Sequence, residues 1–155
     1  IYEEADEAIR HADIVVIGPG DLYTSLLANI VVGGMPKALQ ETCAKLIYVV
    51  NLMTKTGQTY QFKATDHVVE LEKYIGRPVD VVICNTGKFP PSILHKYEKE
   101  DEFPVEDDLD KLAGRKIVRG NLLATEEIKK VSGDTLKRSL IRHDPQRLAK
   151  VIMGI

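Results

Sequence analysis

The chain has 155 residues, a formal net charge of −2 and a hydrophobic fraction of 44%. This length is enough for one domain with a real core, and we treat residues 1–155 as a single domain. The balanced charge gives no indication of a nucleic-acid partner, and no apolar run approaches the ~20 residues of a membrane span.

The chain opens on Ile1 rather than Met and begins with a helical pattern. Ala5, Ala8 and Ile9 lie at helical spacing, and an apolar run rich in β-branched residues follows from Asp13 to Gly18. This run predicts a buried strand. A helix that leads into a buried parallel strand normally has another strand before it. We therefore expect the N-terminal half of the fold to be absent from this chain.

The first strand runs directly into Gly18-Pro19-Gly20, and a helical pattern follows from Leu22 to Val32. This order predicts a strand, a tight turn and a helix N-terminus. A helix N-terminus presents backbone N–H groups and the positive end of the helix dipole, so it suits a phosphate. Gly18 and Gly20 would let the backbone approach that phosphate closely. The turn predicts a nucleotide or another phosphorylated ligand.

Three polar residues at this turn have alternative roles. Asp21 can be the N-cap of the helix, or it can contact a metal ion or ligand, because a carboxylate beside a phosphate needs a cation or a hydroxyl between them. Thr24 and Ser25 can donate to phosphate oxygens, or one of them can bond within its own helix.

Two further apolar runs repeat the pattern of the first. They cover Leu46 to Val50 and Val79 to Cys84, and the three runs start at residues 13, 46 and 79. This spacing is close to the length of one βαβ unit. Continuous β-branched runs between helices indicate parallel strands covered on both faces. The predicted fold is therefore an α/β, Rossmann-like three-layer fold with a mostly parallel sheet.

The remaining elements are shorter or more exposed. Glu98 to Asp110 is mostly acidic and predicts a solvated face. Asp144 precedes Pro145 and an amphipathic run, which is a strong helix start. The other predicted elements are helices over Pro36 to Cys43, Asp66 to Ile75 (capped by Thr65 or Asp66), Ser92 to Tyr97 and Asp144 to Ile152, and an edge strand over Lys116 to Val118.

In a parallel sheet, ligands bind beyond the carboxyl ends of the strands. The segments Gly18 to Ser25, Asn51 to Thr59 and Asn85 to Lys88 should therefore line one crevice. Within the second of these, Asn51 can hold a ribose, a base or the neighbouring backbone, and Thr54 and Thr59 add hydrogen-bonding groups.

Four charged or titratable residues are weaker candidates. Lys55 and Lys88 can place positive charge near a phosphate, although an exposed lysine is usually just solvated. His67 lies at a helix start near the rim of the crevice, where a ligand contact and a surface position are both open. Arg142 precedes a capped helix, and arginine is the side chain best suited to bidentate phosphate recognition.

Several site types find no support in the sequence. Cys43 and Cys84 form no metal-ligand pattern, and we interpret them as reduced thiols of a cytoplasmic protein. No Ser-His-Asp or Cys-His set can be argued, and the Gly-x-Gly-x-x-Gly dinucleotide fingerprint is absent.

Four segments in order resemble the YvcK proteins, also called gluconeogenesis factors, of the CofD-like superfamily. Gly18 to Ser25 resembles their GPGSLYTS segment, and Asn51 to Thr59 resembles N-x-M-T-x-x-G-E-T. Thr65 to Val68 resembles S-D-H-V, and Arg142 to Pro145 resembles R-H-D-P. The spacing fits over nearly the whole chain, as its C-terminal portion.

The resemblance implies a regulatory protein that binds a sugar nucleotide such as UDP-N-acetylglucosamine and influences carbon metabolism and cell-wall morphogenesis. It implies ligand contacts from Tyr97 and Arg142. The expected partner is a UDP-sugar or another nucleotide, without nucleic acid or a membrane span, and a homo-oligomer is left open. The alternative is a transferase of phosphorylated groups like CofD, in which Asp21 would help hold Mg²⁺.

Three positions depart from the family pattern. Asp21 replaces the usual serine, Ala28 stands where proline is usual, and Gln58 stands where glutamate is usual. The first change converts a hydroxyl donor into an anion, which weakens the case for phosphate contact at position 21.

Overall fold

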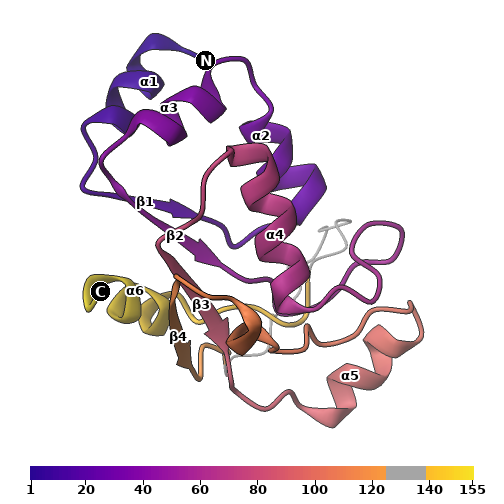
Figure 1. Ribbon diagram of the computed structural model, residues 1–155. Helices are drawn as coiled ribbons and strands as arrows, with labels where there is room; N and C mark the ends of the chain where they lie inside the picture. Colours follow the sequence, from indigo (N-terminus) through magenta and orange to yellow (C-terminus); the bar gives the residue numbers. More distant parts are fainter. Residues whose placement is uncertain (125–138) are drawn as a thin grey trace, which may run out of the picture.

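A four-stranded parallel sheet forms the centre of the protein (Figure 1). The computed structural model describes residues 1–124 and 139–155. The strands are β1 (Ile14–Ile17), β2 (Lys45–Val49), β3 (Val81–Asn85) and β4 (Lys116–Gly120), in the spatial order β1-β2-β3-β4. Every neighbouring pair is parallel. The predicted parallel α/β sheet is confirmed, and β4 lies at an edge as expected.

Helices cover both faces of this sheet, which confirms the three-layer architecture. On one face, Tyr48 and Val82 pack in a cluster with Leu71 of α4 (Ala64–Ile75). On the other face, Ile47 and Ile83 pack with Leu148 of α6 (Pro145–Met153). The layer that contains α4 also contains η1 (Leu22–Leu27), α2 (Ala28–Ile30) and α3 (Met35–Glu41). The remaining described elements are α1 (Glu3–Arg10), α5 (Pro91–Glu98) and the 3-10 turn η2 (Leu109–Lys111).

The first strand is buried on one face only, which corrects the prediction of a strand covered on both. Ile17 is buried, but Ile14 and Val16 remain 38% and 41% exposed. The cluster on the α6 side draws its strand residues from β2, β3 and β4 and none from β1. A run of four apolar residues cannot distinguish a central strand from an edge strand, because both need at least one apolar face.

The segment after β1 begins with a wide helical turn rather than a regular α-helix. Leu22–Leu27 forms a π-helix, and the N–H groups of Ser25 and Leu26 both donate to the carbonyl oxygen of Asp21 at 3.0 Å. The side chain of Asp21 makes no capping hydrogen bond. Asp21 therefore starts the helix through its backbone, and the predicted carboxylate cap is wrong.

The later helices form near the predicted ranges, but α4 begins at Ala64 with Lys63 at the N-cap position, so the predicted cap at Thr65 or Asp66 is wrong. Asp66 accepts a hydrogen bond from the N–H of Lys63 at 2.8 Å, and α4 ends at Gly76, whose φ of 83° is the left-handed conformation that glycine adopts most readily. Asp144 accepts hydrogen bonds from the N–H groups of Gln146 (2.9 Å) and Arg147 (3.0 Å) at the start of α6. No helix within residues 1–124 and 139–155 is long and apolar enough to cross a membrane.

The acidic segment from residue 98 to residue 110 is not simply a solvated face. Glu102 and Leu109 are buried, and Asp108 accepts a hydrogen bond from the N–H of Thr65 at 2.9 Å. The segment therefore packs against the start of α4. An acidic composition does not reveal which carboxylates turn inward.

Replacing Asp144 by alanine is expected to lower the free energy of unfolding by about 1 kcal/mol, because two backbone N–H groups lose their acceptor. Urea denaturation followed by circular dichroism measures the change. The Asp144→Ser variant is the control, since serine is an equally good cap and should restore most of the loss. Equal destabilisation by serine and alanine would contradict the capping role.

Candidate functional site

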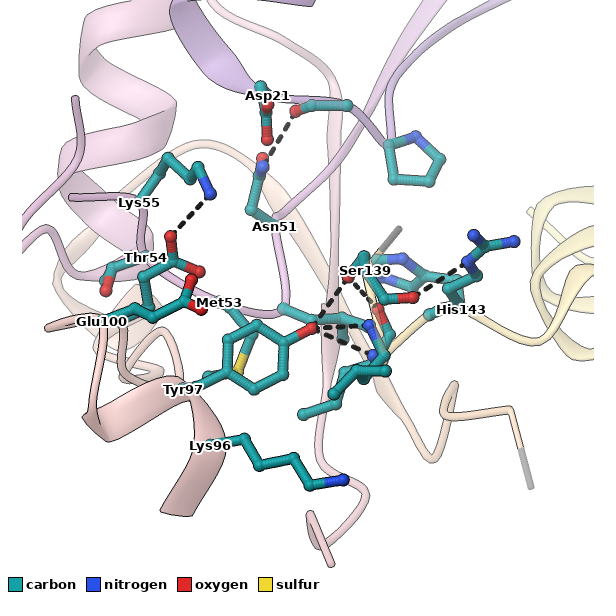
Figure 2. Close-up of a pocket in the computed structure, with 17 residues that line it drawn as sticks. Asp21, Asn51, Met53, Thr54, Lys55, Lys96, Tyr97, Glu100, Ser139 and His143 are labelled. Carbon is teal, nitrogen blue, oxygen red and sulfur yellow. Dashed lines mark hydrogen bonds and ion pairs between the residues drawn. The ribbon is translucent and has the colours of Figure 1, made fainter. Parts of the chain in front are cut away.

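A cavity of about 520 Å³ lies where β1 and β2 end, in the position predicted for a parallel sheet (Figure 2). Its volume is within the range of small-molecule sites. Four chain segments line it: Pro19 to Asp21, Asn51 to Lys55, the α5 region with Lys96, Tyr97, Glu100 and Glu102, and Ser139 to His143.

The cavity brings together residues that are far apart in the sequence. Asp21 comes from the turn after β1, Asn51 from the loop after β2, and Tyr97 from α5. Of the ligand-binding candidates, the following line it: Gly20, Asp21, Asn51, Thr54, Tyr97 and Arg142.

The other five candidates, Gly18, Thr24, Ser25, Thr59 and His67, do not line this cavity. Thr24 and Ser25 are exposed on η1. Thr59 is 3% exposed, and its hydroxyl accepts a hydrogen bond from the N–H of Lys55 at 2.9 Å. Gly18 has a φ of 90°, and a Cβ there would lie 3.1 Å from the carbonyl oxygen of Val49. This glycine allows a close approach of two backbone segments.

His67 lies in the core, not at the rim of the crevice or on the surface. It is fully buried, its Nδ1 lies 3.0 Å from the carbonyl oxygen of Lys63, and its ring meets Phe62 edge-on. Burial lowers the pKa of this imidazole. The side chain therefore acts as a neutral packing group of α4.

The third predicted loop does not line the cavity either. The Oδ1 of Asn85 accepts hydrogen bonds from the N–H groups of Leu122 (2.9 Å) and Gly87 (3.0 Å). This amide joins the ends of β3 and β4. Lys88 is exposed and lies outside the cavity. The α5 region and residues 139–143 line the cavity in its place.

Asn51 connects two of the lining segments. Its Nδ2 donates a hydrogen bond to the carbonyl oxygen of Gly20 at 2.8 Å. Of its possible roles, the structure shows the contact with neighbouring backbone. This bond holds the Gly18 to Asp21 turn against the loop that follows β2.

Lys55 and Glu102 form an ion pair in the wall of the cavity. Nζ of Lys55 lies 2.6 Å from Oε1 of Glu102, whose side chain is only 6% exposed. The hydrogen bond with Glu102 raises the pKa of Lys55, and the charge of Asp21 acts in the same direction. Because Lys55 lies near both carboxylates, it reduces the negative potential on the side of the cavity labelled Asp21, Lys55 and Glu100 in Figure 2.

Backbone pairing holds this wall in place. The N–H of Thr54 donates a hydrogen bond to the carbonyl oxygen of Phe103 at 2.7 Å, and the N–H of Phe103 donates one to Oγ1 of Thr54 at 2.9 Å. The N–H of Val105 donates to the carbonyl oxygen of Leu52 at 3.0 Å. The polar side chain of Thr54 thus stabilises the loop that lines the cavity.

His143 places a neutral imidazole on the side of the cavity away from Lys55 (Figure 2). Burial lowers its pKa to about 4. Its Nε2 is buried and has no hydrogen-bond partner within the described part of the chain. The ring is therefore uncharged at neutral pH, and Arg142 supplies the positive charge of this segment.

Among the described residues, no group of three or more His, Cys, Asp or Glu side chains could hold a metal ion. Cys43 and Cys84 are both free cysteines. Any divalent cation in the cavity would depend on one or two carboxylates such as Asp21, together with phosphates of a ligand.

Sequence reasoning missed most of the lining from α5 onward, including Glu102, Ser139 and His143. Glu102 lies in an acidic run that gives no sign of burial, and Ser139 belongs to no recognisable motif. His143 was within reach of prediction, because it adjoins Arg142 in the R-H-D-P segment.

Comparison with known proteins identifies the family of this chain. The family model described as 2-phospho-L-lactate transferase CofD matches residues 1–123. The chain belongs to the CofD family. Within it, the chain is similar to proteins named gluconeogenesis factor, which confirms the resemblance drawn from the four segments.

Three relatives from Thermotoga and Bacillus species are matched over nearly all of this chain. A putative gluconeogenesis factor of Thermotoga maritima is 40% identical over 152 residues, covering 98% of this chain and 46% of the relative. The gluconeogenesis factor of Bacillus subtilis is 33% identical over 155 residues, covering 98% of this chain and 45% of the relative. A crystal structure of a Bacillus halodurans protein, described as a UPF0052 family member, superposes with a TM-score of 0.85 at 30% identity and covers 98% of this chain and 46% of that one. The chain therefore spans just under half the length of these proteins.

Proposed function

We propose that the cavity binds a sugar nucleotide of the UDP-N-acetylglucosamine type, and that the protein is a regulatory binding protein of carbon metabolism and cell-wall morphogenesis. The single observation that carries the proposal is the convergence of Tyr97 and Arg142 in one cavity at the carboxyl edge of the sheet. These are the two residues to which the family resemblance assigns nucleotide contact.

The chemistry of the lining suits such a ligand. Arginine matches the geometry of phosphate oxygens, and an aromatic ring offers an apolar surface to a base or sugar. Carboxylates such as that of Asp21 accept hydrogen bonds from sugar hydroxyls. The similarity to proteins named gluconeogenesis factor supports a role in carbon metabolism.

Titration calorimetry with UDP-N-acetylglucosamine tests the proposal, using the protein at its natural length. We expect saturable heat and an upward shift of the melting temperature, because a ligand that binds only the folded state stabilises it. N-acetylglucosamine without the nucleotide is the control and should bind much more weakly. Absence of both heat and thermal shift at millimolar UDP-N-acetylglucosamine would contradict the proposal.

The second candidate is a CofD-like transferase that uses Mg²⁺. One observation favours it: Asp21 lines the cavity, and its carboxylate makes no capping hydrogen bond at the start of the helix. Mg²⁺ usually binds through one or two carboxylates plus phosphates of the substrate.

In the transferase case, Mg²⁺ should tighten nucleotide binding, and Asp21→Asn should remove that effect while leaving metal-free binding nearly unchanged. Calorimetric titrations with Mg²⁺ and with a chelator measure both quantities. The Glu98→Gln variant is the control, because Glu98 is exposed on α5 and does not line the cavity. If neither Mg²⁺ nor the Asp21→Asn change alters nucleotide binding, the role of Asp21 as a Mg²⁺ ligand in the transferase hypothesis is contradicted.

A further inference from the structure

The hydroxyl of Tyr97 is saturated with hydrogen bonds to one short segment (Figure 2). Its oxygen accepts hydrogen bonds from the N–H groups of Leu140 (2.9 Å) and Ile141 (3.1 Å). It also lies 3.0 Å from Oγ of Ser139, whose own proton is donated to the carbonyl oxygen of Ile141 at 2.7 Å. The Tyr97 proton therefore goes to Ser139. A phenol has one donor and two acceptor sites, so no capacity remains for a ligand.

The segment that Tyr97 holds leads directly to Arg142. Nε of Arg142 donates a hydrogen bond to the carbonyl oxygen of Ser139 at 3.3 Å. Beyond it, the chain pairs with residues 122–124: the carbonyl oxygen of Arg142 accepts from Ala124 N–H at 2.9 Å, and Asp144 N–H donates to Leu122 at 2.7 Å. Arg142 is thus fixed by the main chain on its C-terminal side and by Tyr97 on its N-terminal side.

Much of the guanidinium nevertheless stays available with respect to the residues that the structure describes. Within the described residues, Nε is the Arg142 nitrogen that donates a hydrogen bond, and the residue is exposed at the cavity. Its two terminal NH₂ groups can therefore donate to phosphate oxygens as a bidentate pair. Holding the segment in advance reduces the ordering cost of that contact.

We propose that Tyr97 is a positioning residue, whose hydroxyl fixes residues 139–141 so that Arg142 meets the phosphates of the bound nucleotide. The ligand contacts only the ring of Tyr97. This inference rests on the proposed function, and it assigns the phosphate end of the ligand to the Arg142 side of the cavity and not to the glycine turn.

The test is the Tyr97→Phe variant, which keeps the ring and removes the hydroxyl. Affinities for UDP-N-acetylglucosamine and for inorganic pyrophosphate are measured by calorimetry at several salt concentrations. We expect about a tenfold loss for both probes, the scale of a lost hydrogen bond to a charged group. The salt dependence of binding should flatten as it does in Arg142→Ala, because a phosphate contact is lost. Tyr60→Phe is the matched control, since the half-exposed Tyr60 lies outside the cavity.

A double-variant comparison separates positioning from direct contact. In an Arg142→Ala background, Tyr97→Phe should cause no further loss, because both changes remove the same phosphate contact. Additive losses, unchanged affinity in Tyr97→Phe, or an unchanged salt dependence would overturn the proposal. Amide hydrogen exchange at Leu140 and Ile141 in the ligand-free protein should rise in Tyr97→Phe, and unchanged exchange would also overturn it.

The two proposals fail in different ways. Suppose that the wild-type protein does not bind UDP-N-acetylglucosamine but binds pyrophosphate, and that Tyr97→Phe weakens this binding only while Arg142 is present. The proposed nucleotide is then wrong, and the positioning role of Tyr97 stands. If the nucleotide binds and the losses from Tyr97→Phe and Arg142→Ala are additive, the positioning role is wrong and the proposed function stands. If the wild-type protein binds neither probe, both are overturned.

Discussion

Replacing Arg142 by alanine is expected to weaken binding of UDP-N-acetylglucosamine by about 1.5–3 kcal/mol, a loss of roughly 10- to 150-fold in affinity. The reason is that a charge-assisted contact with phosphate disappears, while the rest of the cavity remains. Calorimetric titration of the wild-type and variant proteins measures the difference, with the free energy of unfolding recorded alongside to show that the fold persists.

The matched control is Lys88→Ala, which removes a cation from the same edge of the sheet but outside the cavity. It should leave the affinity within about twofold of wild type, because Lys88 is exposed to solvent and does not line the cavity. Arg142→Lys should fall between wild type and alanine, since lysine keeps the charge but loses the bidentate geometry. Equal affinity of wild type and Arg142→Ala would remove Arg142 from the site.

Most of the fold follows from features that act locally in the sequence. The β-branched runs, Pro145 after Asp144 and Gly76 after α4 each act through backbone preferences that hold in almost any surroundings. The exceptions concern long-range packing. The pattern of Ile14 and Val16 cannot show that one face of β1 lies uncovered, because that depends on where α6 packs.

The candidate site was less predictable, because its far wall comes from segments without a pattern of their own. The rule for parallel sheets placed Asp21 and Asn51 together, since both lie in the turns that follow strands. It could not place Glu102 or Ser139, which reach the cavity through the irregular chain around α5 and before α6. The rule also placed the loop after β3 at the cavity. The amide of Asn85 instead binds the backbone of Gly87 and Leu122.

His143 gives the protein a stability that depends on pH. Burial lowers the pKa of this imidazole to about 4, against about 6.5 in the unfolded chain. The folded state therefore binds fewer protons than the unfolded state between these two values. The contribution of neutral His143 to the free energy of unfolding is complete above pH 6.5 and is lost progressively as the pH falls toward 4. It amounts to about 3 kcal/mol over the whole window.

Lowering the pH from 7.5 to 5 should thus reduce the free energy of unfolding by about 2 kcal/mol more in the wild type than in His143→Gln. Urea denaturation at a series of pH values measures the difference. Subtracting the variant isolates His143 from His67, whose burial lowers its pKa and which titrates in the same direction. His95→Gln is the control, since the side chain of His95 is 71% exposed, and it should retain the wild-type pH dependence. Parallel pH profiles for wild type and His143→Gln would show that this imidazole is not held neutral by the fold.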